Sequence, residues 1–169
     1  MATPARRILV GFGIALPIVA ASLGWYWFRH SMAPAASFAV NEPGLPQHVL
    51  IATQGSAFKD AIVRGVVERL EQRPLYIQVV DVTGLASIDE RDWDAIVVLH
   101  TWQLEQPQPD AAAFIARAND RRKVIVLSTS GAGTQKIAGI DAISAASQMT
   151  DVASRVAELV ARIDSELAH

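Results

Sequence analysis

Three short segments carry the side chains best suited to binding a ligand. They are residues 53–56 (Thr-Gln-Gly-Ser), 100–103 (His-Thr-Trp-Gln) and 128–131 (Ser-Thr-Ser-Gly), and each follows an apolar run. Hydroxyls and the N–H groups of glycine-containing loops hold phosphate, and an indole ring stacks against a flat aromatic ligand. The predicted binding residues are Thr53, Gln54, Gly55, Ser56, Thr101, Trp102, Ser128, Thr129 and Ser130.

Other chemistries have less support in the sequence. His100 could act as a general base with Ser130 as the nucleophile, but no third group or nucleophile-elbow motif accompanies the pair. With no cysteine and four scattered histidines, the chain lacks the ligand spacing of a zinc site. The sequence therefore predicts no catalytic residue and no metal ligand, and it leaves open whether the protein is an enzyme.

Residues 48–169 resemble the flavodoxin family, and two stretches carry the resemblance. Residues 51–62 (IATQGSAFKDAI) are similar to its phosphate loop, and residues 93–103 (WDAIVVLHTWQ) are similar to its third strand and ring-contacting loop. The resemblance implies that Thr53, Gly55 and Ser56 hold the phosphate of FMN and that Trp102 flanks the flavin ring. Gln54 and Ala57 stand where the family pattern has hydroxyls, as a module that kept the fold without the cofactor would show.

A further fragment, residues 141–147 (DAISAAS), resembles the motif at which FMN is covalently attached in some extracytoplasmic electron-transfer domains. Ser147 would then be the attachment residue, although Ala145 replaces the glycine of that motif. The favoured interpretation is a strand end made of small residues, with Ser147 or Thr150 capping the last helix.

From residue 48 onward, stretches with the hydrophobic pattern of a strand alternate with stretches that have the pattern of a helix. Apolar runs predict strands, and apolar residues three and four apart predict helices. The expected strands are His48–Ala52, Leu75–Val80, Ala95–Leu99, Lys123–Ser128 and Ile140–Ile143. The expected helices are Phe58–Gln72, Asp110–Ala118 and Thr150–Leu167, with a weakly helical Gly84–Asp92.

This alternation predicts a flavodoxin-like three-layer α/β sandwich. Its parallel sheet would have the order 2-1-3-4-5, and the ligand would lie at the carboxyl ends of the strands. Only residues 129–139 separate the fourth and fifth strands, so the fourth helix must be short or missing.

An uncharged run over residues 8–28 precedes this domain. It is long enough to cross a bilayer core of about 30 Å, and an aromatic cluster ends it. The chain thus divides into a cytoplasmic N-terminus (1–7), a transmembrane anchor (8–28), a linker (29–47) and the flavodoxin-like domain (48–169). A cleaved signal peptide that ends at Ala33-Pro34-Ala35 is the other interpretation.

The charges around the run orient it. Two arginines precede the run and one follows it closely, so residues 31–169 are expected outside the cytoplasm. All 17 acidic residues but only 12 of the 15 basic ones lie after residue 41, a balance unsuited to binding nucleic acid. The expected partners are the lipid bilayer and a membrane protein.

Two functions follow from these observations. The first is a membrane-anchored accessory or interaction module with no catalytic activity of its own. The alternative is an FMN-binding electron-transfer protein that serves a membrane redox partner. The altered phosphate loop favours the accessory module.

Overall fold

The computed structural model describes residue 19 and residues 33–169 except 136, 138 and 141. The expected N-terminus (1–7) and anchor (8–28) lie outside the described residues, apart from Val19. In the part of the chain that is described, no helix is both long and apolar enough to cross a membrane.

Strands and helices alternate from residue 38 to the C-terminus, as the hydrophobic periods predict. The strands are β1 (Phe38–Val40), β2 (Gln47–Thr53), β3 (Leu75–Asp81), β4 (Ala95–Thr101), β5 (Val124–Thr129) and β6 (Ala142–Ala145). The α-helices are α2 (Ala57–Leu70), α3 (Pro109–Arg117) and α4 (Val152–Leu167). Short 3-10 turns are η1 (Val82–Ser87), η2 (Glu90–Asp92), η3 (Arg121–Lys123) and η4 (Met149–Asp151).

These strands form a mostly parallel six-stranded sheet in the order β1-β3-β2-β4-β5-β6. The order differs from the predicted one because β1 is added antiparallel at the edge, with Phe38 opposite Val79. β1 comes from residues expected to be an extended linker, and residues 33–47 belong to the same compact unit as the rest of the domain. A three-residue strand gives no periodic signal, so only its pairing with β3 defines it.

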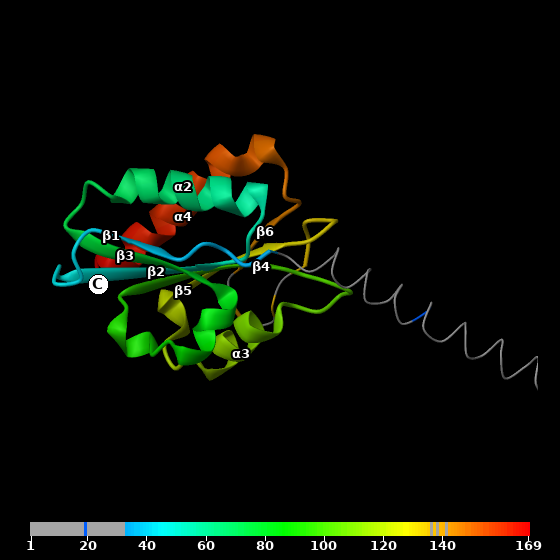
Figure 1. Cartoon of the computed structure of the whole chain (residues 1–169), viewed down its shortest axis with the longest axis horizontal. Coiled ribbons are helices and arrows are strands. Elements are labelled where there is room, and N and C mark those ends of the chain that lie inside the picture. Colours follow the sequence, from blue (N-terminus) through cyan, green and yellow to red (C-terminus); the bar gives the residue numbers. More distant parts are fainter. Residues whose placement is uncertain (1–18, 20–32, 136, 138, 141) are drawn as a thin grey trace, which may run out of the picture. The chain divides into compact units, whose positions relative to one another are not determined.

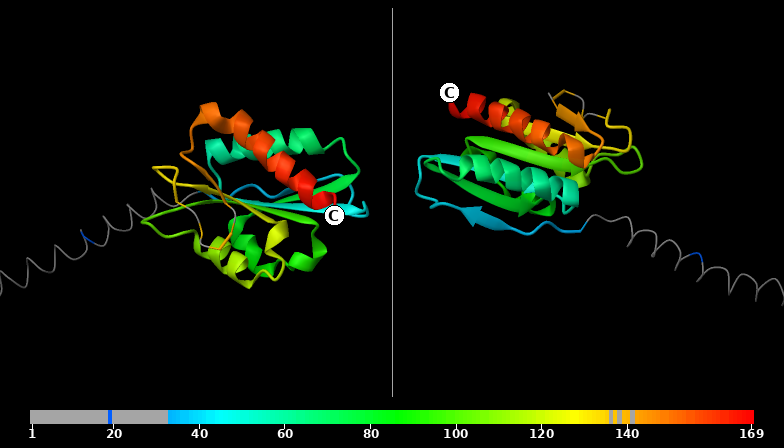
Figure 2. Two further views of the ribbon diagram at one scale, coloured as in Figure 1. Left: turned by 180° about the vertical axis from the view of Figure 1, so that it is seen from behind. Right: turned by 90° about the horizontal axis from the view of Figure 1, so that it is seen from above.

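Helices cover both faces of the sheet, which gives three layers (Figures 1 and 2). Successive strand residues point to opposite faces, so each buried strand contributes side chains to two hydrophobic cores, one on each face of the sheet. Val49, Val97 and Leu127 pack with α2 and α4. Leu50, Val98 and Val126 pack with α3 and η1. Strands buried on both faces explain the continuous apolar runs in the sequence.

The connection between β5 and β6 shows no helix among its described residues. This agrees with the expectation of a short or missing fourth helix in an 11-residue connection. The fold is a three-layer α/β architecture, which is compatible with a flavodoxin-like arrangement.

Candidate functional site

The three hydroxyl-rich segments meet at the carboxyl edge of the sheet. Thr101 and Thr129 are register partners at the ends of β4 and β5, and the Trp102 N–H donates to the Thr129 carbonyl at 2.8 Å. The Gln54 side chain reaches across from β2, where its Oε1 accepts the Thr101 N–H at 2.7 Å. Parallel strands sharing one edge therefore bring the sequence-predicted segments into contact.

The loop after β2 uses its polar groups internally. Gln54 is buried against β4, and the Thr53 hydroxyl lies 3.3 Å from the Gln54 carbonyl. The Ser56 hydroxyl accepts the Lys59 N–H at 3.2 Å and is the N-cap of α2. Such a cap stabilises a helix by about 1 kcal/mol. Gln54 and Ser56 thus have structural partners in the fold itself.

Residues 33–35 lie against this loop. The Gly55 N–H donates to the Ala33 carbonyl at 2.9 Å, and the Ala35 N–H donates to Asp81 Oδ2 at 2.7 Å. A Cβ at Gly55 would lie 2.6 Å from the Ala33 oxygen and 3.1 Å from the Pro34 oxygen. Glycine is needed here because of this close backbone approach. We call residues 33–35 the strap.

Lys59 is a polar residue of this edge that the sequence analysis did not single out. Its side chain is 1% exposed, and Nζ donates to Thr101 Oγ1 at 2.5 Å. Thr101 Oγ1 lies 2.9 Å from Thr129 Oγ1, and the Thr129 hydroxyl donates to the His100 carbonyl at 3.2 Å. Burial lowers the pKa of Lys59 to about 8, and the nearby Asp60 carboxylate only partly opposes this shift. One feature of the sequence could have identified Lys59 as buried: it lies at helical spacing from the apolar residues Val63, Val66 and Leu70.

His100 occupies the other face of the sheet, toward α3. Its Nε2 lies 2.8 Å from Ser128 Oγ, and both residues are fully buried. Burial lowers the pKa of His100 to about 4, so the ring is neutral at pH 7. Ser130, the nucleophile of the His–Ser hypothesis, accepts the Gly133 N–H instead. His100 therefore pairs with Ser128, in a position closed to substrate.

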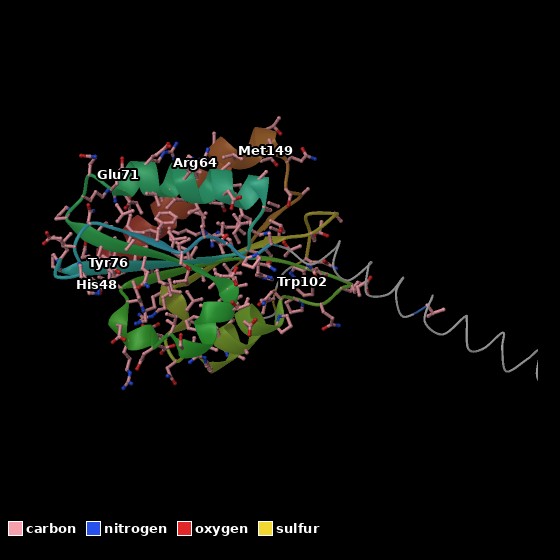
Figure 3. All side chains as sticks on the ribbon, in the orientation of Figure 1. His48, Arg64, Glu71, Tyr76, Trp102 and Met149 are labelled. Carbon is pink, nitrogen blue, oxygen red and sulfur yellow. The ribbon has the colours of Figure 1, made fainter. Side chains whose placement is uncertain are left out.

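Trp102 lies beside His100, with ring centroids 6.4 Å apart. Figure 3 shows it at the opposite end of the sheet from His48 and Tyr76. The indole is half-buried, and within the described chain neither Trp102 Nε1 nor His100 Nδ1 has a hydrogen-bond partner.

With the strap in place, the Gly55 N–H is unavailable to the phosphate of FMN, because it already donates to the Ala33 carbonyl. Two surface pockets lie elsewhere, one beside Arg121 and Arg162 and one between η2 and α3. Among the described residues, no group of three or more acidic or histidine side chains could hold a metal ion.

The prediction that Ser147 or Thr150 caps the last helix is wrong. α4 begins at Val152, and its N-cap, Asp151, makes no side-chain capping bond. Ser147 has a positive φ of 53° in the turn before η4. Thr150 instead donates to the Asp151 carboxylate at 3.4 Å, and both residues belong to η4, the 3-10 turn that directly precedes α4. Asp141, the first residue of the attachment-like motif, lies outside the described residues.

Comparison with known proteins gave no match, either to a protein-family model or to a curated protein.

Proposed function

We propose that this protein is a membrane-anchored accessory module that presents an α/β domain to a membrane-protein partner and performs no catalysis of its own. The observation that carries this proposal is the hydrogen bond from the Gly55 N–H to the Ala33 carbonyl. The loop that resembles a phosphate loop is thereby bonded to the protein's own backbone.

The neighbouring polar groups support the same proposal. Ser56 caps α2, Gln54 links β2 to β4, and His100 is buried in hydrogen-bond contact with Ser128. Buried polar groups that satisfy one another favour a single rigid arrangement. In the alternative function, FMN-binding electron transfer, the strap would have to leave Gly55 before the loop could accept a phosphate.

FMN titration separates the two functions. The full chain in a non-ionic detergent is titrated with FMN while tryptophan fluorescence is followed, with riboflavin as the control without phosphate. The accessory module predicts no saturable quenching up to about 1 mM FMN, a ceiling that corresponds to about 4 kcal/mol of binding free energy. Saturable quenching by FMN that riboflavin does not reproduce would show FMN binding, contradict the cofactor-free module and favour the redox function instead.

A further inference from the structure

Leu104 and Glu105 form the tip of a tight hairpin in the loop after β4. Gln103 and Gln106 pair across it, and the N–H of each donates to the carbonyl of the other at 2.9 Å. Both tip residues have a positive φ, 49° at Leu104 and 61° at Glu105. A two-residue hairpin turn with positive φ at both positions is type I′, for which Asn-Gly is the favoured pair. A leucine and a glutamate therefore adopt this conformation at an energetic disadvantage.

The Leu104 side chain faces solvent. It is 83% exposed, more than any other large apolar residue among those described. An asparagine at this position would suit the backbone better and would be better hydrated. A leucine that is unfavourable for the turn and contributes nothing to the core is typical of a residue that contacts something outside the fold.

The hairpin lies at the carboxyl edge of the sheet, where the chain also enters the domain. Leu104 comes soon after the end of β4, and Trp102, which begins the loop, lies at this edge in Figure 3. Residue 33, the first of the compact domain, is hydrogen-bonded to Gly55 at the same edge. Met149 follows the end of β6 and is a second exposed apolar side chain on this side of the sheet.

The proposed anchor brings a bilayer close to this edge. Four residues, 29–32, separate the end of the uncharged run at residue 28 from residue 33. An extended chain gains at most about 3.6 Å per residue, so the path from residue 28 to residue 33 covers no more than about 18 Å. The edge that carries the hairpin is thus tethered close to the membrane surface.

We propose that the hairpin tip contacts the membrane, with the Leu104 side chain in the interfacial layer of neutral, zwitterionic lipid. This proposal rests on the membrane anchor of the proposed function. An apolar side chain beside polar ones suits this layer, because the apolar part enters the acyl boundary while the polar groups stay among the head groups. The charged residues of the segment 102–110, Glu105 and Asp110, are both acidic, which makes anionic lipid the less favourable surface.

Site-directed fluorescence tests the proposal, because the chain has no cysteine and a single one is readily introduced. The full chain with Gln106→Cys carries a bimane label next to an intact tip and is reconstituted into phosphatidylcholine vesicles. The quencher is phosphatidylcholine with a nitroxide near the top of its acyl chain, which acts on labels that reach the interfacial layer. We expect quenching at position 106 and none in the control Gly44→Cys, an open position in the turn before β2 at the opposite edge.

The decisive variant is Leu104→Asn in the chain labelled at position 106. Asparagine suits the positive φ and keeps the turn, so a purely structural role of Leu104 predicts unchanged quenching, whereas the membrane contact predicts its loss. Leu104→Met keeps an apolar side chain and should retain the quenching. Loss in both variants would assign the effect to the turn and overturn the contact.

Vesicle flotation distinguishes a failure of this proposal from a failure of the anchor. A chain that floats with the vesicles but shows no quenching at position 106, or equal quenching at positions 44 and 106, overturns the contact and leaves the anchor standing. Equal quenching with and without Leu104→Asn has the same consequence, because the tether alone then explains it. A chain that does not float after removal of detergent overturns the anchor, and the contact is overturned with it.

Discussion

At the scale of single residues, two ring side chains of the carboxyl edge, His100 and Trp102, each have one buried nitrogen without a hydrogen-bond partner among the described residues. His100 is fully buried, and its Nδ1 has no partner among the described residues. An unsatisfied buried donor destabilises a fold by about 1–3 kcal/mol, whereas an unpaired acceptor is tolerated more easily. This difference favours the tautomer in which Nε2 carries the proton and donates to Ser128.

The lowered pKa of His100 gives a prediction for acid stability. Its pKa falls from 6.5 to about 4 on folding, so between these pH values the unfolded chain binds the proton and the native protein does not. The free energy of unfolding should therefore decrease as the pH falls from 6.5 to 4, by up to about 3 kcal/mol from this residue. Urea unfolding across this pH range measures the effect.

His100→Gln should remove most of this pH dependence, because glutamine does not titrate. The matched control is His169→Gln, at the exposed C-terminal residue, which should leave the profile unchanged. Equal pH profiles for the wild type and His100→Gln would contradict the assignment.

The sequence predicted which segments meet at the carboxyl edge, but it did not predict the partners of their side chains. The three hydroxyl-rich segments meet at one edge because strand order and direction are enough to bring them there. The partners of individual side chains could not be predicted, because side-chain direction and helix packing decide that His100 meets Ser128 rather than Ser130. Lys59 was missed because a lysine on a helix is usually solvated, although its spacing from Val63 and Leu70 placed it on the buried stripe.

At the scale of elements, the sequence predicted the five parallel strands and the three main helices to within a few residues. Long apolar runs and helical stripes are strong local signals. β1 was not predicted, since its three residues are held by pairing with distant Val79 and Ile77. The strap was missed for the same reason: its alanines and proline carry no local signal of the bond to Gly55.

Gly55→Ala tests how firmly the strap is held. The new Cβ would lie 2.6 Å from the Ala33 oxygen, so one backbone segment must move. We expect the free energy of unfolding to fall by about 1–3 kcal/mol, as for an overpacked site. Amide exchange of residue 55 should become faster, because the hydrogen bond from its N–H to the Ala33 carbonyl is broken.

Gly131→Ala is the control for this prediction, because a Cβ at Gly131 meets nothing within 4 Å. Its effect on stability should stay within about 0.5 kcal/mol. Equal stability of the two variants would show that the strap contributes little to the fold.

At the scale of the whole molecule, the proposed function requires an anchor before residue 33 and a domain outside the cytoplasm. External protease, added to cells with a permeabilised outer layer, should then digest the domain and spare cytoplasmic marker proteins. The full-length chain should stay in the membrane fraction after a carbonate wash, as expected for a spanning helix. Protection of the domain would reverse the orientation, and a soluble product beginning near Ala36 would identify a signal peptide.

The strap also determines which hydrogen bonds of the domain break first when the chain is pulled from its N-terminal side. Any pull that enters the domain through residue 33 reaches Gly55 first and then β1, which runs antiparallel to β3 along the sheet edge. A force directed along the strands loads the hydrogen bonds of β1 together, in shear, instead of opening them one by one. Beyond β1, the Asn41 side chain donates to the carbonyls of Glu71, Arg73 and Leu75. The first bond to yield would be Ala33–Gly55, so tension would free the Gly55 N–H before the sheet begins to unravel.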